Sequence, residues 1–152
     1  MTPEKDDGKK IMVFGTFDVF HAGHEYFLRE AKQLGDYLIA VIARDSTVQK
    51  VKGELPQHDE RDRLHAVKES GYADKVTLGS EDDKYKVIRK YKPDIIALGY
   101  DQFVFTYALN KIIIDENLDT EIIRLEPYEP SMYKSSLIKT LAEDEEENEK
   151  AS

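Results

Sequence analysis

The stretch Ile11-Met12-Val13-Phe14-Gly15-Thr16-Phe17-Asp18-Val19-Phe20-His21-Ala22-Gly23-His24 decides the fold. Ile11 to Phe14 form a short apolar run, which is typical of a strand that a parallel sheet buries on both faces. Gly15 follows at the point where the strand must leave the sheet, and a helix is expected to begin beside the histidines. The stretch therefore predicts a buried strand, a glycine turn and the first turn of a helix.

The two histidines of this stretch are candidate ligand-binding residues. His21 and His24 are three positions apart, so they lie on one side of the expected first helical turn. Gly23, between them, carries no side chain that could obstruct a ligand. Unpaired backbone N–H groups and the positive end of the helix dipole lie at the same place. This combination favours the binding of phosphate.

Strands and helices are expected to alternate along the rest of the chain. Continuous apolar runs predict strands, and apolar residues at helical spacing predict helices. The expected strands are 11–14, 37–43, 75–78, 95–98 and 121–125, and the expected helices are 26–34, 59–70, a segment around 85–88, 107–117 and a closing segment around 137–141. This alternation predicts an α/β fold, a Rossmann-like open parallel sheet of about five strands with helices on both faces.

Composition limits the class of protein. The 152 residues contain no cysteine, which excludes disulfides and thiolate metal sites. The formal net charge is −9, and much of it comes from the acidic run at 143–149. We therefore expect a single domain over 1–142 and a solvated, disordered tail over 143–152. An acidic surface does not favour nucleic acid, and no apolar run reaches the length of a membrane span, so a cytoplasmic protein is expected.

The unusual polar residues follow the expected strands. The segment 44–57 predicts a mobile basic loop after the second strand, with Lys50 and Lys52 on it. Gly99-Tyr100-Asp101 follows the fourth strand and repeats the strand-then-glycine pattern of the opening stretch. Because ligands of open α/β sheets bind at the carboxyl ends of the strands, we expect these segments to meet at one crevice.

The opening motif also carries a resemblance. Gly15-Thr16-Phe17-Asp18 followed by His21-x-Gly23-His24 resembles the signature of the cytidylyltransferase-like nucleotidyltransferases, and the likeness extends from Ile11 to about Thr140. It implies that the glycine turn and both histidines contact the phosphates of a nucleoside triphosphate. Lys50 and Lys52 resemble the mobile lysines of the family, which close over the nucleotide and the incoming phosphate.

Further positions are similar to family motifs. Arg63 is similar to the arginine on the second helix, and Ser135-Ser136 resembles the closing motif that contacts nucleotide phosphates. Three segments, 43–48, 92–96 and 98–102, look most like archaeal FAD synthases, which implies transfer of AMP from ATP to FMN with release of pyrophosphate. Glycerol-3-phosphate cytidylyltransferase, which would use CTP and glycerol 3-phosphate, is the alternative. The resemblance also implies Mg²⁺ with the triphosphate and a homodimer.

Other interpretations of the same residues remain open. His21 and His24 have a spacing that occurs in zinc sites, or one of them could serve only as a helix cap. Asp18 could bind Mg²⁺ directly or could hydrogen-bond to a group that binds the ion. At the level of function, the alternatives are a nucleotide or flavin sensor that does not catalyse a reaction, and an interaction module that recruits a partner through its acidic tail.

Overall fold

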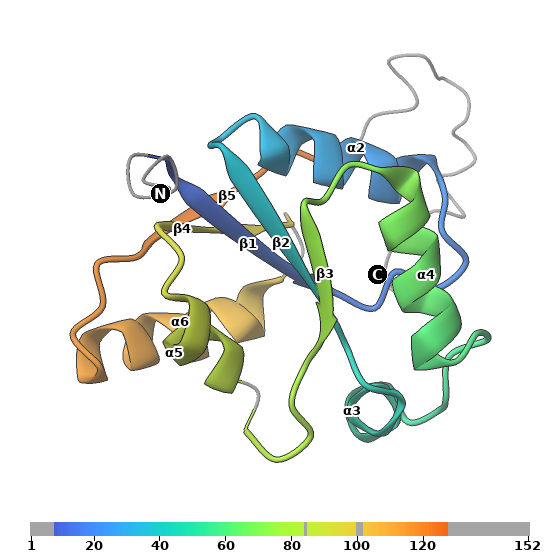
Figure 1. The fold of residues 1–152 in the computed structure, drawn as a ribbon. Coiled ribbons are helices and arrows are strands. Elements are labelled where there is room, and N and C mark those ends of the chain that lie inside the picture. Colours follow the sequence, from blue (N-terminus) through green and yellow to red (C-terminus); the bar gives the residue numbers. More distant parts are fainter. Residues whose placement is uncertain (1–7, 84, 100–101, 128–152) are drawn as a thin grey trace.

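The computed structural model describes residues 8–83, 85–99 and 102–127, in which strands and helices alternate (Figure 1). The strands are β1 (Lys10–Gly15), β2 (Tyr37–Ile42), β3 (Lys75–Leu78), β4 (Ile95–Leu98) and β5 (Glu121–Arg124). The helices are α2 (Ala22–Lys32), α3 (Asp45–Lys52), α4 (Glu60–Ser70), α5 (Lys86–Tyr91) and α6 (Phe103–Asp115). The expected strands are thus all present at nearly the expected residues.

The strands form one parallel sheet in the order β3-β2-β1-β4-β5. β1 lies in the centre and pairs with β2 along its whole length, from Lys10 opposite Tyr37 to Gly15 opposite Ile42. On its other side β1 pairs with β4. The chain therefore builds outward first on one side of β1 and then on the other, and the strand order reverses between β1 and β4. The predicted Rossmann-like α/β fold is confirmed.

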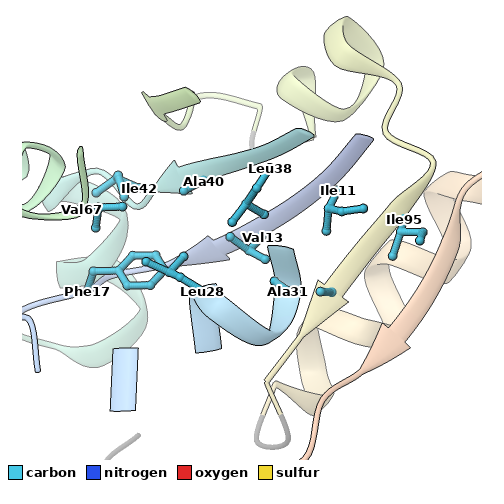
Figure 2. Packing of buried hydrophobic residues seen from close by; sticks show 11 residues of the cluster. Ile11, Val13, Phe17, Leu28, Ala31, Leu38, Ala40, Ile42, Val67 and Ile95 are labelled. Atoms are coloured by element: carbon cyan, nitrogen blue, oxygen red, sulfur yellow. The ribbon is translucent and has the colours of Figure 1, made fainter. Parts of the chain in front are cut away.

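Helices cover both faces of the sheet. Successive β1 side chains point to opposite faces, so the apolar residues of β1 pack against helices on each side. Ile11 and Val13 face α2 and α4, in a cluster that includes Leu28 and Val67 (Figure 2). Met12 faces the other side, where residues of α5 and α6 pack against the sheet. Ile11, Met12 and Val13 are all 0% exposed. Burying such a side chain stabilises the fold by about 1.5–3 kcal/mol, so β1 anchors the site that follows it.

The prediction of a loop over 44–57 is wrong for much of that segment. Asp45–Lys52 forms helix α3, which ends at Gly53 with a left-handed φ of 86°. Val48 is the buried residue of this helix, so the apolar periodicity that would have predicted it is nearly absent. Contacts from α4 to the start of α3, described below, supply the stabilisation that the local sequence lacks.

Other boundaries differ by less. α4 begins at Glu60 after the N-cap Asp59 and ends at Gly71, as expected. α6 begins at Phe103, earlier than the expected start near Tyr107. The closing helix around 137–141 and the acidic tail at 143–152 lie outside the described residues. The single-domain boundary at residue 142 therefore stays a prediction.

Candidate active site

The candidate site lies where the strand order reverses, at the carboxyl ends of β1 and β4. Gly15 ends β1, and Gly99 directly follows β4. Gln102 connects the two ends, because its side-chain nitrogen donates to the Phe14 carbonyl at 3.3 Å and its side-chain oxygen accepts from the Gly99 N–H at 2.8 Å. This edge is where open α/β sheets bind their ligands.

The histidine turn, residues 15–24, leaves β1 under tight steric constraint. A Cβ on Gly15 would lie 2.7 Å from the Phe17 ring, so only glycine fits at this position. Phe17 itself has a left-handed φ of 53°, and Val19 has one of 51°, a conformation that costs a β-branched residue about 1 kcal/mol or more. The surrounding structure therefore holds this turn in one particular shape.

Phe17 was predicted to bind nucleotide, and the structure places its side chain in the core. The ring is 4% exposed and packs edge-on against His24, with 5.4 Å between ring centroids. Phe20 stacks on His24 from another direction at 5.5 Å. The two phenylalanine rings thus fix the orientation of the His24 imidazole by packing against it from two directions.

His21 and His24 both act as caps at the N-terminus of α2. The Nδ1 atom of His21, the N-cap residue, accepts the N–H of Gly23 at 3.1 Å. The Nδ1 atom of His24 accepts the N–H of His21 at 3.2 Å, which completes a capping box. The two rings stack with their centroids 3.9 Å apart and an angle of 23° between their planes. The alternative role as helix caps and the predicted role in binding therefore use different atoms of the same rings.

These caps determine the protonation of both rings. A neutral imidazole carries its proton on one nitrogen, so an accepting Nδ1 leaves the N–H on Nε2. Burial lowers the pKa of His21. Burial, followed by the nearby His21 and Lys52, lowers the pKa of His24 to about 4, although Asp18 acts in the opposite direction. At neutral pH the pair is thus uncharged and carries two Nε2–H donors.

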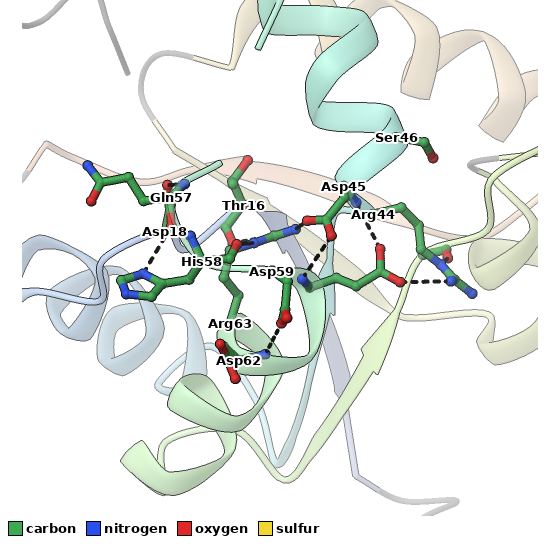
Figure 3. Close-up of polar contacts among 12 residues, drawn as sticks. Thr16, Asp18, Arg44, Asp45, Ser46, Gln57, His58, Asp59, Asp62 and Arg63 are labelled. Carbon is green, nitrogen blue, oxygen red and sulfur yellow. Dashed lines mark hydrogen bonds and ion pairs between the residues drawn. The ribbon is translucent and has the colours of Figure 1, made fainter. Parts of the chain in front are cut away.

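Asp18 holds the segment before α4 against the histidine turn. Its carboxylate accepts the N–H of Gln57 at 2.7 Å and the N–H of His58 at 3.0 Å, and the His58 ring lies 3.4 Å away (Figure 3). Burial alone would raise the pKa of Asp18, but these hydrogen bonds and the His58 imidazole outweigh it and lower that pKa. The Asp18 carboxylate therefore stays ionised and holds the segment at Gln57 and His58 in position.

Arg63 is buried, with 1% of its surface exposed. Its guanidinium donates to the His58 carbonyl at 2.9 Å, to the Thr16 carbonyl at 2.9 Å and to the Asp45 carboxylate at 2.7 Å. All three guanidinium nitrogens thus have partners inside the protein (Figure 3). The sequence predicted a phosphate contact for Arg63, whereas its geometry fits a residue that ties α4 to the histidine turn and to α3.

Lys50 and Lys52 lie on opposite sides of α3. Both side chains are exposed. Lys50 lines a cavity of about 310 Å³ together with Thr47, Glu81 and Tyr85. Lys52 lies near enough to His24 to lower its pKa. Residues two positions apart on a helix point in roughly opposite directions, so the two lysines lie on different sides of α3, and Lys52 is the one whose charge acts on His24.

The remaining predicted residues divide into described and undescribed positions. Thr16 and Gly23 lie in the histidine turn, where the Gly23 N–H is engaged in the cap and the Thr16 carbonyl accepts from Arg63. Gly99 lies at the end of β4. The other four predicted residues, Tyr100, Asp101, Ser135 and Ser136, lie outside the described residues.

Several polar residues at the site were not predicted. Asp45 and Glu60 exchange hydrogen bonds between the first residues of α3 and α4. Arg124, at the end of β5, donates to the Gly99 carbonyl at 2.8 Å and so supports the turn after β4. Acidic residues at helix starts are common, and the sequence carries no signal that pairs two of them across 15 positions.

The part of the chain that the structure describes contains neither a metal-binding cluster nor a membrane-spanning helix. In residues 8–83, 85–99 and 102–127, no group of three or more histidine and carboxylate side chains is placed to hold a metal ion. Within the same ranges no helix is both long enough and apolar enough to span a bilayer.

An open parallel sheet whose switch point carries a capped histidine pair at a helix N-terminus defines an α/β protein with a candidate phosphate site. A family comparison makes the assignment specific. Residues 12–141 match the model of the cytidylyltransferase-like family, and the chain belongs to this family. The protein is accordingly a nucleotidyltransferase, as the opening motif predicted.

Relatives with similar sequences carry a common name. The FAD synthase of Thermoplasma acidophilum is 40% identical over 130 residues, which cover 86% of this chain and 91% of that protein. The FAD synthase of Pyrococcus horikoshii is 40% identical over 132 residues, covering 86% of each chain. The FAD synthase of Archaeoglobus fulgidus is 44% identical over 115 residues, covering 75% of this chain and 82% of that protein.

Solved structures show the same fold. A Thermoplasma volcanium protein described as a lipopolysaccharide core biosynthesis protein is 40% identical, with a TM-score of 0.74 over 80% of this chain and 98% of that chain. The pantoate–β-alanine ligase of Francisella tularensis is 16% identical, with a TM-score of 0.56 over 78% of this chain and 59% of that chain. The second likeness concerns the fold alone.

Proposed function

We propose that the protein transfers AMP from ATP to FMN, forming FAD and pyrophosphate. The structural observation that carries this proposal is the capped histidine pair, which presents two neutral Nε2–H donors at the start of α2. Similarity to FAD synthases across most of the chain supports the choice of ATP and FMN over other substrates of the same reaction.

In the proposed reaction a phosphate oxygen of FMN attacks the α-phosphorus of ATP. The bond from the α-phosphorus to the bridging oxygen breaks, and pyrophosphate leaves with the electron pair. The FMN phosphate is already an anion near neutral pH, so no strong general base is needed. What the reaction requires is stabilisation of negative charge on the phosphate oxygens, which preorganised donors supply.

Each part of the histidine turn has a role in this proposal. His21 and His24 donate from Nε2 to the α-phosphate and to the bridging oxygen. The dipole of α2 favours the same negative charge, while the Gly23 N–H stays engaged in the cap. Lys52, on α3, neutralises the incoming phosphate or the departing pyrophosphate. The predicted contacts of Gly99, Tyr100, Asp101, Ser135 and Ser136 with the nucleotide remain part of the proposal.

A divalent cation, Mg²⁺ by preference, would accompany the triphosphate. This ion is usually bound through substrate phosphates and water with one or two carboxylates. Asp18 is the carboxylate of the histidine turn, and both of its oxygens already accept backbone N–H groups. We therefore propose that phosphate oxygens supply most of the ligands of the cation.

A homodimer also stays a prediction, which sedimentation of the purified protein tests directly.

The experiment that tests the function is an assay of pyrophosphate release with ATP or CTP, each combined with FMN or glycerol 3-phosphate. The expected result is release that requires both ATP and FMN, with FAD as the second product. Release that requires CTP and glycerol 3-phosphate would assign the alternative reaction. Binding of nucleotide without turnover under any combination would contradict an enzyme of this type and favour a sensor.

A further inference from the structure

Helix α3 is poorly anchored by apolar contacts. It has eight residues, and Val48 is its buried side chain. Its N-cap residue, Arg44, makes no side-chain cap of its own. Helices this short are marginal in water without external support. The position of α3, and of Lys52 at its last turn, must therefore be determined by other contacts.

A reciprocal cap joins the N-termini of α3 and α4. The Asp45 N–H donates to Glu60 Oε1 at 2.8 Å, and the Glu60 N–H donates to Asp45 Oδ2 at 3.2 Å. Each carboxylate thus occupies the positive end of the other helix, where a negative charge is stabilising. The second oxygen of Glu60 accepts from Arg44 Nη1 at 3.2 Å. The two helix starts are fixed to each other by paired, directional bonds.

The reciprocal cap is connected to the histidine turn through Arg63. The buried guanidinium contacts Asp45 Oδ1 at 2.7 Å on one side and the Thr16 carbonyl at 2.9 Å on the other (Figure 3). Arg44, at the other side of the cap, donates from Nε to the Gly79 carbonyl at 2.7 Å, which lies just after β3. Hydrogen bonds therefore fix the position of the start of α3 relative to the ends of both β1 and β3.

We propose that the reciprocal cap of Asp45 and Glu60 fixes the direction of α3 and so positions Lys52, in its last turn, for the transfer reaction; both acidic residues are then positioning residues. This inference rests on the function proposed above. α3 is about 12 Å long, so a tilt at its start displaces Lys52 at its end. Neither carboxylate needs to contact substrate for this role.

Glu60→Ala is the decisive variant. Its side chain is 20% exposed, and its removal leaves the pair of Asp45 with the buried Arg63 intact, so the protein should still fold. We expect kcat to fall roughly tenfold with KM for ATP nearly unchanged, because a charge is misplaced in the transition state. Glu60→Gln keeps an oxygen for the Asp45 N–H and should restore most of the rate. Glu69→Ala, an exposed change of the same charge on the same helix, is the matched control and should leave kcat unchanged.

A double-mutant cycle with Lys52→Ala shows whether Glu60 acts through Lys52. We expect Lys52→Ala to lower kcat roughly thirtyfold, below the hundredfold typical of a buried donor because Lys52 is exposed. The double variant should then be no slower than Lys52→Ala alone, since the two changes remove one effect. Effects on kcat that multiply would overturn the inference while leaving the proposed function intact.

An NMR titration of His24 tests the same point without any turnover. The groups that act on the charge of this imidazole are His21, Asp18 and Lys52. Removing Lys52 should raise the His24 pKa, and Glu60→Ala should raise it too if Lys52 moves away. Direct loss of a carboxylate would lower that pKa, so the two explanations have opposite signs. A lowered or unchanged His24 pKa in Glu60→Ala overturns the inference, whether or not the wild-type protein converts FMN.

Discussion

The histidine turn and the start of α3 show two different ways to build one site. In the histidine turn the hydrogen bonds that orient the two imidazoles are local, since His21 caps Gly23 two positions away and His24 caps His21 three positions away. At the start of α3 the contacts are distant, because Asp45 meets Glu60 and Arg63 across 15 and 18 positions. Local contacts leave a pattern in the sequence, and distant ones become visible only after the chain folds.

The largest expected effect comes from His24, which tests the local half of this contrast. His24→Asn keeps a side-chain acceptor for the His21 N–H but loses the Nε2–H donor. We expect kcat to fall on the order of a hundredfold or more with a small change in KM for ATP, measured by pyrophosphate release. His65→Asn, an exposed histidine on α4, is the control. Unchanged turnover in His24→Asn would reduce the histidine pair to a helix cap.

Arg63→Met tests the contacts between residues distant in the sequence, and the quantity measured is the free energy of unfolding. The change leaves the Thr16 and His58 carbonyls without their donor and Asp45 without its ion-pair partner. Breaking a buried pair in this way costs about 3 kcal/mol, with some relief here because Asp45 is partly exposed. Urea unfolding should show this loss, while Arg61→Met at an exposed position should show almost none. A loss below about 1 kcal/mol would mean that the guanidinium is not needed to hold the two regions together.

Lys50 and Lys52 of α3 are expected to contribute unequally to kcat. Lys52 lies on the side of His24, and Lys50 lines the cavity beside Glu81. Lys50→Ala should therefore lower kcat less than about threefold, against the roughly thirtyfold loss expected for Lys52→Ala. Steady-state kinetics on the two variants measures the difference. Equal losses would show that the arrangement of α3 changes when substrate binds.

The last test of the histidine turn is a pH dependence of stability. The pKa of His24 is about 4 in the folded protein and near 6.5 when unfolded, so between these values the unfolded chain binds more protons. Stability should be complete above pH 6.5 and should decrease as the pH falls toward 4. Urea unfolding at a series of pH values measures this slope. His24→Asn should flatten it, and a slope that persists in this variant would assign it to other groups.

The fold and the histidine turn were both predictable from the sequence for one physical reason. A parallel strand buried on both faces must be continuously apolar, as Ile11 to Val13 are, and a turn against an aromatic ring needs glycine at Gly15. The family resemblance rested on Gly15 and the residues that follow it as far as His24. α3 was missed because its two valines, Val48 and Val51, give too short an apolar pattern to indicate a helix, and the bonds that stabilise the helix start come from α4.

Residue types and their local spacing determined on their own that this chain forms a parallel sheet, and they predicted a phosphate-binding helix start after its first strand. The tertiary structure decided which nitrogen of each histidine caps the start of α2, which lysine carries the charge that acts on His24, and that Arg63 is buried among protein carbonyls. The physical reason is the range of the forces involved. A strand or helix that will be buried needs apolar residues at a regular local spacing, which the sequence displays, whereas a directional hydrogen bond between distant residues exists only when folding has placed both partners.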